Sequence, residues 1–571
     1  MQDFRKTLKW WQTAVVYQIY PRSFQDTDND GLGDLRGIIK RLNYLDKLGV
    51  DAIWISPIYP SPNVDNGYDI ADYRDIDPKF GTMQDFEELL DKAHAKGIRI
   101  IMDLVVNHSS DQHDFFIKAL EDKDSKEHSF YHFHKGFRDE DGKAIAPPNK
   151  WGAVFGGSAW EYVKDLDLYY LHSFAIEQPD LNWENPDLRA QVYEMMRYWC
   201  DKGVDGFRMD VINLIAKPDP IPMEKPDGTY TGLDFANSDK VHTYLQEMNR
   251  EVLSKYDLLT VGETGGVRPE DAYKYANKEG TELSMIFQFE HVDELDKDGP
   301  KGRYYPYEVH LTDLKDIFTR WQEGLEGKAW NSLFWCNHDQ PRIVSRFGND
   351  SEEYREKSAK MLAHILHFQK GTPYIYQGEE LAMTNMPFRS KAELRDISAL
   401  NAIKNEKEYS EEVVFEEVLR TGRDNARTPM QWDDSKNAGF SGADETWIRV
   451  NPNYKYINAK EQLQRQDSVF YYYQALIKLR HEEALITTGK YELFDAKDPH
   501  TYSYCRYTDE EALFVTSNFT KYKQKVIIPS EFRNKQGEVW LTNDESLKDI
   551  DMLEAKLELP AYAALAFHIK K

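Results

Sequence analysis

Three short segments each end an apolar, strand-like run in a carboxylate. They are 206–210 (GFRMD), 259–263 (LTVGE) and 337–340 (NHDQ). Hydrolysis of a glycosidic bond needs one acid that protonates the departing oxygen and one carboxylate that faces the anomeric carbon. A third carboxylate beside them can hold the sugar and help keep the proton donor protonated, because like charges resist ionising together. The three acids, Asp210, Glu263 and Asp339, therefore predict an enzyme that acts on sugars.

The elements that must position these acids alternate between strand-like and helical patterns over most of the chain, which favours a parallel sheet with crossover helices. In segment 185–201, for example, Asn185 can cap a helix, Pro186 fits its first turn, and apolar residues recur at helical spacing. Eight such units form a (β/α)₈ TIM barrel, an α/β fold whose active site lies at the C-terminal ends of the strands. The eight strand candidates are 14–20, 52–58, 99–106, 206–211, 258–262, 283–289, 332–336 and 373–377.

Two long segments interrupt the alternation. Residues 109–180 are too long for an ordinary connection and predict a small inserted domain after strand three that walls one side of the pocket. Residues 380–430, after strand eight, form a second insertion. From residue 489 short alternating runs predict a C-terminal antiparallel β-sandwich domain, 489–571. The catalytic barrel is then expected to comprise residues 1–108 and 181–488.

Composition narrows the class of protein. The 571 residues carry 72 basic and 98 acidic side chains, a net charge of −26, which argues against nucleic acid or an anionic membrane as partner. No run approaches the roughly 20 apolar residues of a membrane span, and residues 1–11 lack an apolar signal core. Three dispersed cysteines imply no disulfide framework. No glycine-rich nucleotide loop follows a strand, so no organic cofactor is expected. We expect a monomeric, cytoplasmic enzyme with a small oligosaccharide substrate.

Five motifs then occur in order at barrel spacing. Besides the three acidic segments, they are 103–108 (DLVVNH) and 178–182 (QPDLN). Across essentially its full length the chain resembles the α-amylase superfamily, glycoside hydrolase family 13. The segment 178–182 is similar to the signature of the oligo-1,6-glucosidase subfamily. One such motif alone would be weak support, whereas five in order are specific.

By this resemblance Asp210 corresponds to the nucleophile, Glu263 to the acid/base and Asp339 to the transition-state stabiliser. The residues agree, since Arg208 lies two positions before Asp210 on the same strand face and should keep it ionised. Glu263 has no basic neighbour in sequence before Arg268, so repulsion from the other two acids should keep it protonated. The family retains anomeric configuration, which predicts a separation of about 5–5.5 Å between the carboxyls of Asp210 and Glu263.

The resemblance also implies a sugar pocket. His108 and His338 correspond to the pair that hydrogen-bonds the cleaved glucose, and each ends a predicted barrel strand. Phe174 and Gln178 are expected to border the next subsite.

Segment 62–69, after strand two, carries further pocket residues by resemblance. Tyr68 corresponds to the platform under the first glucose, and Asp65 with Arg423 to the pair that closes the pocket over it. A closed end implies an exo enzyme that releases glucose from the non-reducing end. The alternative for Asp65 is an ordinary turn, because Asp-Asn-Gly is itself a strong turn signal.

The loop 26–34 places acids at alternate positions with glycine at the turn, like the first nine positions of an EF-hand loop. Gly37 stands where an EF-hand has its bidentate glutamate, so no high-affinity calcium sensor is expected. Subfamily relatives bind a structural ion in the matching loop. A structural Ca²⁺, or Mg²⁺, is expected here, and a solvated acidic turn is the alternative. The expected ligands are Asp26, Asp28, Asp30, the Leu32 carbonyl and Asp34.

Linkage preference depends on Val211, directly after the nucleophile position. In the subfamily valine there goes with α-1,6 bonds, which favours isomaltose, panose and short isomalto-oligosaccharides, although one contact discriminates by only about 1–3 kcal/mol. Alternatives are an α-glucosidase that prefers α-1,4 bonds or sucrose, a dextran glucosidase and a trehalose-6-phosphate hydrolase. Segment 289–295 lacks the Arg-Leu-Asp-Arg-Asp loop of sucrose isomerases. Gly265 and Gly266 could widen the aglycone site. A catalytically inactive binding module is disfavoured because all three acids are present.

Overall fold

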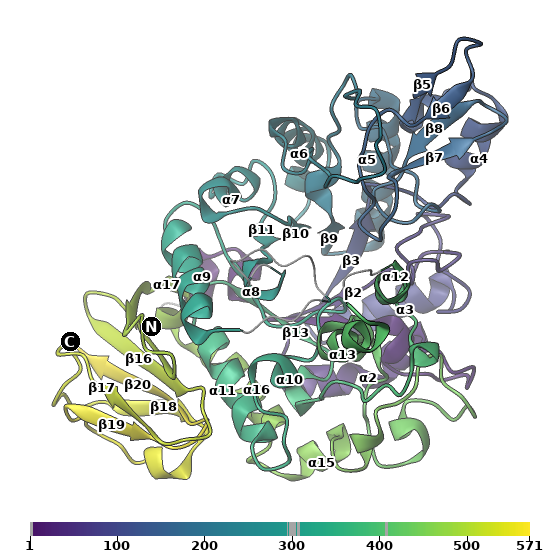
Figure 1. The fold of residues 1–571 in the computed structure, drawn as a ribbon. Helices are drawn as coiled ribbons and strands as arrows, with labels where there is room; N and C mark the ends of the chain where they lie inside the picture. Colours follow the sequence, from purple (N-terminus) through teal and green to yellow (C-terminus); the bar gives the residue numbers. More distant parts are fainter. Residues whose placement is uncertain (1–3, 294, 296–303, 305–308, 406–408) are drawn as a thin grey trace.

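The computed structural model describes residues 4–293, 295, 304, 309–405 and 409–571, and places a parallel sheet at the centre of the chain (Figure 1). Its spatial order is β11-β10-β9-β3-β2-β1-β13-β12. Each strand overlaps one of the eight predicted segments, so the predicted barrel is confirmed. The strands are β1 (Val16–Ile19), β2 (Ala52–Ile55), β3 (Arg99–Val105), β9 (Gly206–Asp210), β10 (Leu259–Glu263), β11 (Met285–Phe287), β12 (Ser332–Phe334) and β13 (Thr372–Tyr376).

The first barrel strand pairs with the last. β1 and β13 are parallel neighbours, with Val16 opposite Tyr374. The strands at the two ends of the order, β11 and β12, form no backbone ladder among the described residues. They meet through the Ser332 hydroxyl, which donates to the Ile286 carbonyl at 2.7 Å. The barrel is therefore nearly closed.

Helices follow the strands and surround the barrel (Figure 1). In α5 the Asn185 side chain accepts from the backbone N–H groups of Asp187 and Leu188, Pro186 occupies the first turn, and Gly203 ends the helix at φ 108°. The helix predicted near residues 185–201 is thus confirmed. The main barrel helices are α2 (Leu35–Leu48), α3 (Met83–His94), α5 (Pro186–Lys202), α6 (Asp239–Glu251), α7 (Pro269–Tyr275), α9 (Leu311–Gly324), α11 (Arg355–His367) and α16 (Val469–Glu482). Shorter helices are α1 (Trp10–Thr13), α8 (Glu290–Asp293), α10 (Ile343–Phe347), α15 (Ala459–Gln464) and α17 (Ala484–Thr488).

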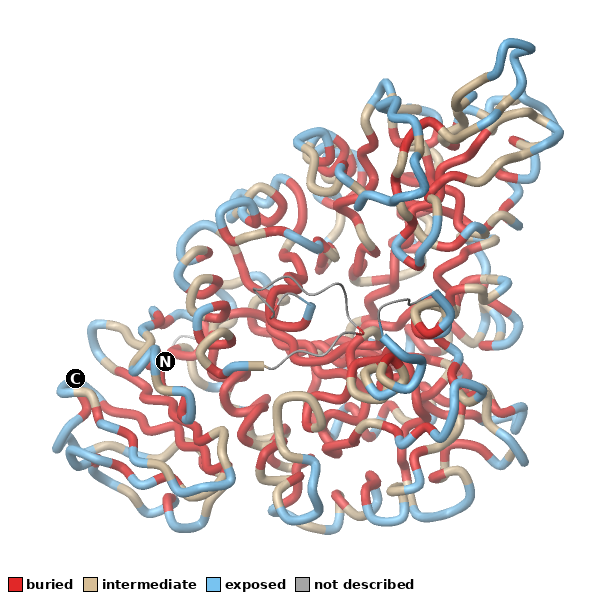
Figure 2. Tube along the Cα trace, in the orientation of Figure 1, coloured by how far each residue is buried: buried red, intermediate tan, exposed pale blue. Residues whose placement is uncertain are grey.

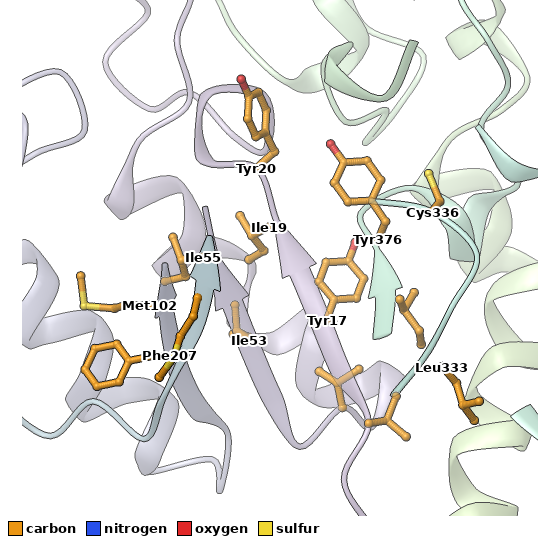
Figure 3. Close-up of a cluster of buried hydrophobic side chains, with 14 of the residues drawn as sticks. Tyr17, Ile19, Tyr20, Ile53, Ile55, Met102, Phe207, Leu333, Cys336 and Tyr376 are labelled. Carbon is orange, nitrogen blue, oxygen red and sulfur yellow. The ribbon is translucent and has the colours of Figure 1, made fainter. Parts of the chain in front are cut away.

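The barrel strands are buried on both faces, as expected for a parallel sheet covered by helices. Alternate residues enter different layers: Val16 and Trp54 pack inside the barrel, whereas Tyr17, Ile53 and Ile55 pack in the layer that includes the helices. Figure 3 shows part of this outer layer, with side chains from neighbouring strands in contact. In Figure 2 the strands are almost uniformly buried while the outer helix faces are exposed.

Between β3 and β9 the chain forms a small unit of its own, in the upper right of Figure 1. It contains a three-stranded antiparallel sheet, β4-β8-β7, and a two-stranded one, β5-β6. The elements are α4 (Asp114–Glu121), β4 (Phe133–His134), β5 (Phe137–Arg138), β6 (Ala144–Ala146), β7 (Trp160–Val163) and β8 (Leu168–Leu171).

After β13 the insertion carries α12 (Ile397–Asn405), α13 (Glu411–Thr421) and α14 (Asp424–Arg427). The C-terminal region is antiparallel, with a five-stranded sheet β14-β15-β16-β20-β18 and a pair β17-β19. Among the described residues, no helix is both long and apolar enough to cross a membrane. The C-terminal strands are β14 (Lys490–Phe494), β15 (Thr501–Tyr507), β16 (Glu511–Asn518), β17 (Gln524–Ile527), β18 (Glu538–Thr542), β19 (Lys556–Leu559) and β20 (Ala564–Lys570).

Candidate active site

A cavity of about 1100 Å³ lies at the C-terminal ends of the barrel strands. The predicted catalytic and sugar-binding residues gather around it, although they come from segments far apart in sequence. Nine of the twelve line its wall: Asp65, Tyr68, His108, Phe174, Asp210, Val211, Glu263, Asp339 and Arg423. The other three, Gln178, Arg208 and His338, are buried among the lining residues and contact them.

Arg208 is the buried cation at the base of this site. Its Nη1 donates to Asp210 Oδ1 at 2.9 Å and to Asp103 Oδ1 at 2.8 Å, and its Nη2 donates to Glu263. One guanidinium is therefore shared by three carboxylates. Two of these contacts follow from the sheet order, because β9 lies between β3 and β10, with Asp103 directly opposite Arg208 in register.

The contacts of Arg208 bear on what the sequence predicted for Asp210 and Glu263. Burial raises the pKa of Asp210 well above its ordinary value; Arg208 opposes this shift, while Glu263 and Asp103 add to it. Arg208 therefore contacts Asp210 as expected, but it shares its charge with Asp103 and Glu263 as well. Glu263 has no basic neighbour in sequence before Arg268, but in space Arg208 contacts it.

Val211, directly after Asp210, has an unusual backbone. Its φ of 36° and ψ of 40° lie in the left-handed region, which is an outlier for a β-branched residue. In this conformation its N–H donates to Glu263 Oε2 at 3.2 Å, and its side chain lines the cavity. Such strain persists where the surroundings enforce it, and it concentrates at functional sites.

Asp339, after β12, faces two arginines from the insertion that follows β13. Arg427 Nη2 donates to Asp339 Oδ1 at 2.6 Å, and Arg423 Nη1 lies 3.5 Å from the same oxygen. Sequence reasoning missed Arg427. Its signal was weak, because it lies four residues beyond Arg423 in a helix with no chemical motif of its own.

Asp65 and Arg423 form the expected pair, with 3.6 Å between Asp65 Oδ1 and Arg423 Nη2. Arg423 has a closer partner that was not predicted: its Nη2 and Nε contact Asp396 Oδ1 at 2.6 and 3.0 Å. Burial raises the pKa of Asp65 to about 7, although Arg423 and Arg427 oppose the shift. Asp65 and Arg423 are both buried and together form one wall of the cavity.

Tyr68 lies flat against His338, with ring centroids 5.2 Å apart and an interplanar angle of 6°. Its hydroxyl donates to Asp103 Oδ2 at 3.0 Å, which also accepts from Trp54 Nε1 at 3.0 Å. Burial lowers the pKa of His338 to about 3, so the ring is neutral. Asp103 was missed as a site residue although it begins the motif 103–108.

His108 is likewise neutral, because burial lowers its pKa to about 4. Gln178 is fully buried, and its Nε2 lies 3.1 Å from His108 Nε2 and 3.3 Å from Asp65 Oδ2. It therefore supports the wall from behind and does not line the cavity, unlike the expected subsite border. Phe174 does line it, in ring contact with His108 and Phe155.

The acidic loop 26–34 lies just before α2. Carboxylate oxygens of Asp26, Asp28 and Asp34 lie within 4.8 Å of one another. Asp30 is outside this group, and its Oδ1 accepts from the Leu32 N–H at 2.7 Å. Asp34 also caps α2 by accepting from the Gly37 N–H at 2.7 Å. Three clustered carboxylates are a donor set that suits Ca²⁺ or Mg²⁺.

The (β/α)₈ barrel and its cluster of strand-end carboxylates define the class: a barrel glycosidase. A family model for the alpha amylase catalytic domain matches residues 18–489, and the chain belongs to the α-amylase family. It is 52% identical to the oligo-1,6-glucosidase of Parageobacillus thermoglucosidasius, over 96% of this chain and 97% of that protein. It is 49% identical to the oligo-1,6-glucosidase of Bacillus cereus, over 98% and 100%. A crystal structure of Bacillus licheniformis trehalose-6-phosphate hydrolase superposes with a TM-score of 0.90 at 44% identity, covering 99% of this chain and 100% of that one.

Proposed function

We propose that the protein is a retaining exo-acting α-glucosidase that hydrolyses α-1,6 bonds of isomaltose, panose and short isomalto-oligosaccharides. The observation that carries this proposal is the convergence of Asp210, Glu263 and Asp339 on one cavity with a charged wall. Two relatives of about 50% identity are named oligo-1,6-glucosidases, which supports the linkage.

In the proposed first step Glu263 protonates the glycosidic oxygen while Asp210 attacks the anomeric carbon, so that the glycosidic bond breaks and a glucosyl ester forms on Asp210. Glu263, now deprotonated, takes a proton from water, whose oxygen then displaces Asp210 from the anomeric carbon. Arg208 contacts both Asp210 and Glu263, so it can stabilise negative charge on whichever of the two carboxylates carries it in each step. Two inversions at one carbon give net retention.

Asp339 is proposed to stabilise the positive charge that develops on the sugar ring. Arg427 and Arg423 contact its carboxylate and hold it in place. Asp65 and Arg423 are proposed to bind hydroxyls of the terminal glucose, and Tyr68, backed by His338, to contact its face. This arrangement closes the pocket beyond one glucose and supports release from the non-reducing end.

The charge of the cavity bears on trehalose 6-phosphate as a rival substrate. Five carboxylates line it, and the cations among its described lining residues are Arg346 and Arg423. Arg346 donates to Gln340 Oε1 at 2.8 Å and to the Val292 carbonyl, and Arg423 is bound to acids. This balance disfavours a phosphate group. The lining acids are Asp65, Asp210, Glu263, Asp293 and Asp339.

The proposal is tested by glucose release from isomaltose, panose, a longer isomalto-oligosaccharide, maltose, sucrose and trehalose 6-phosphate at equal concentration. We expect isomaltose and panose to give the highest kcat/KM. Preference for the longer chain would indicate a dextran glucosidase. If maltose or sucrose has the highest kcat/KM, the proposed preference for α-1,6 bonds is wrong. If only trehalose 6-phosphate reacts, a phosphate site exists that the described lining does not explain.

The same substrates also test the role of Val211 in linkage preference. Replacing Val211 by alanine removes a branched side chain from the cavity wall beside the leaving group, and should shift the isomaltose-to-maltose ratio of kcat/KM towards maltose by about 10-fold. The ratio is the readout because a general loss of activity cancels from it. Val526→Ala, the same substitution at a buried residue of β17 outside the cavity lining, should leave the ratio unchanged. An unchanged ratio in Val211→Ala would contradict the role.

We further propose that Asp26, Asp28 and Asp34 hold a structural Ca²⁺ or Mg²⁺. Removing the ion with a chelator should lower the melting temperature, since an ion at about 100 times its dissociation constant stabilises the fold by about 2.7 kcal/mol. Readdition of Ca²⁺ and Mg²⁺ separately would identify it. Asp28→Asn should itself lower the melting temperature, and a chelator should then lower it no further. Equal melting curves with and without chelator in the unaltered protein would exclude the site.

A further inference from the structure

A buried lysine lies behind the sugar-binding wall. Lys217 follows β9 and the short helix η4 (Ile212–Leu214), and its side chain is fully buried. Its Nζ lies 3.0 Å from Asp180 Oδ2 and donates to Asn107 Oδ1 at 2.6 Å. An ammonium group can only donate, so the side-chain oxygen of Asn107 must face Lys217. The orientation of the Asn107 amide is thereby fixed.

This orientation decides the hydrogen position on His108. With its oxygen turned to Lys217, Asn107 presents its NH₂ group to His108 Nδ1, 3.2 Å away. Nδ1 must then accept. Because His108 is neutral, its hydrogen lies on Nε2, where the Tyr68 carbonyl is 3.1 Å away and can accept it.

The groups around His108 Nε2 do not select the tautomer by themselves, because they include an acceptor, the Tyr68 carbonyl, and a donor from Gln178. Gln178 Oε1 accepts from the Ala175 N–H at 3.0 Å, so the Gln178 NH₂ group faces His108 Nε2 at 3.1 Å. The ring thus lies between two amide NH₂ groups, and only one nitrogen of a neutral imidazole can accept. If Asn107 turned over, Nδ1 would carry the hydrogen and Nε2 would accept from Gln178. Lys217 is the group that prevents this.

We propose that Lys217 is a positioning residue that selects the Nε2–H tautomer of His108 through Asn107, and so makes Nε2 a hydrogen-bond donor, to the Tyr68 carbonyl in the free protein and to a sugar hydroxyl in the complex. The ligand named here rests on the proposed function, while the tautomer does not. Asp180 takes part by pairing with the lysine, and its Oδ1 accepts from the Ser173 N–H at 2.9 Å. Asp180 thereby acts on the sugar-binding wall from behind it, through Lys217 and Asn107.

The first test is ¹⁵N NMR of the free protein labelled at histidine, with the His108 signals assigned by their loss in His108→Gln. Protonated and unprotonated ring nitrogens resonate far apart, so the tautomer is read directly. We expect Nε2–H in the unaltered protein. An Nδ1–H ring there would overturn the proposal, whatever any variant does.

The second test is Lys217→Met. We expect the His108 signals to move towards the Nδ1–H form and kcat/KM for isomaltose to fall by about 10- to 100-fold, the range for one lost hydrogen bond to a buried polar partner. Since this variant leaves the buried Asp180 without its cation, Lys217→Met/Asp180→Asn is needed as well. If Lys217 had only a structural role, the double variant should recover both the melting temperature and kcat/KM. The proposal predicts recovery of melting temperature alone, with the altered tautomer retained.

Lys315 supplies the matched control. It is also fully buried, but its Nζ donates to the carbonyls of Asp495 and Asp498, away from the cavity lining. Lys315→Met should lower stability while the folded protein keeps its kcat/KM and the His108 tautomer. An unchanged tautomer in both Lys217 variants would refute the inference. If the unaltered protein releases no glucose, the proposed function fails, yet the tautomer result still stands or falls on its own.

Discussion

Replacing Asp210 by asparagine is expected to lower kcat for isomaltose by about 10⁴- to 10⁶-fold, the scale for loss of a nucleophile. The amide is nearly isosteric and its oxygen can still accept from Arg208, so the cavity should keep its shape. It cannot form the glucosyl ester, and no other carboxylate has the same position at the end of β9. Glucose release at high enzyme concentration measures the residual rate, and calorimetry should still detect sugar binding.

The matched control for this variant is Asp205→Asn, at the opposite end of the same strand. Asp205 accepts from the Ile100 N–H at 2.8 Å and lies 2.7 Å from His94 Nε2, away from the cavity. It should lower the melting temperature and leave kcat nearly unchanged. Turnover by Asp210→Asn above about 1% of the original rate would contradict the nucleophile assignment. Binding with no turnover in the unaltered protein would instead indicate a binding module.

Replacing Glu263 by glutamine is expected to have an effect that depends on the leaving group. A general acid contributes about 10²- to 10⁴-fold, and isomaltose should show the full loss because its leaving sugar alcohol needs a proton. A 4-nitrophenyl α-glucoside, whose leaving group departs without one, should still form the glucosyl ester on Asp210. Hydrolysis of the ester lacks its base, so a burst of nitrophenol equal to the enzyme concentration should precede slow turnover.

Rapid-mixing kinetics measure this burst, and mass spectrometry of the quenched protein should detect one added glucosyl group. The glutamine oxygen can still accept from Arg208 and from the Val211 N–H, so loss of the surrounding geometry is a weak explanation for any effect. An equal loss for isomaltose and the nitrophenyl substrate, without a burst, would exclude Glu263 as the acid/base.

The fold was largely predictable because its physical causes are local. Runs of strand length that are buried on both faces are apolar throughout, and Asn185, Pro186 and Gly203 mark the two ends of α5 in the sequence itself. The acids were predictable for a related reason, since the end of a parallel barrel strand is where side chains can reach a shared pocket.

The charge network was not predictable from neighbours in sequence. The sequence places Arg208 next to Asp210 alone, yet the strand order brings Asp103 and Glu263 to either side of it. Arg423 was read with Asp65, whereas its closest acid, Asp396, comes from the same insertion but from no recognised motif. Gln178 belongs to a specific motif, but a motif does not say whether a side chain lines a cavity or lies behind it.

The pairing of β1 with β13 has a consequence for how the chain is made. Synthesis proceeds from the N-terminus, so β1 emerges early while its neighbour on one side, Thr372–Tyr376, emerges only after almost the whole barrel. Until then an apolar strand has an unpaired edge, which can pair with other chains. Contacts so distant in sequence also form slowly. We therefore expect a chain released before β13 to keep this edge of β1 unpaired, to associate with other copies and to lack the closed barrel that carries the site.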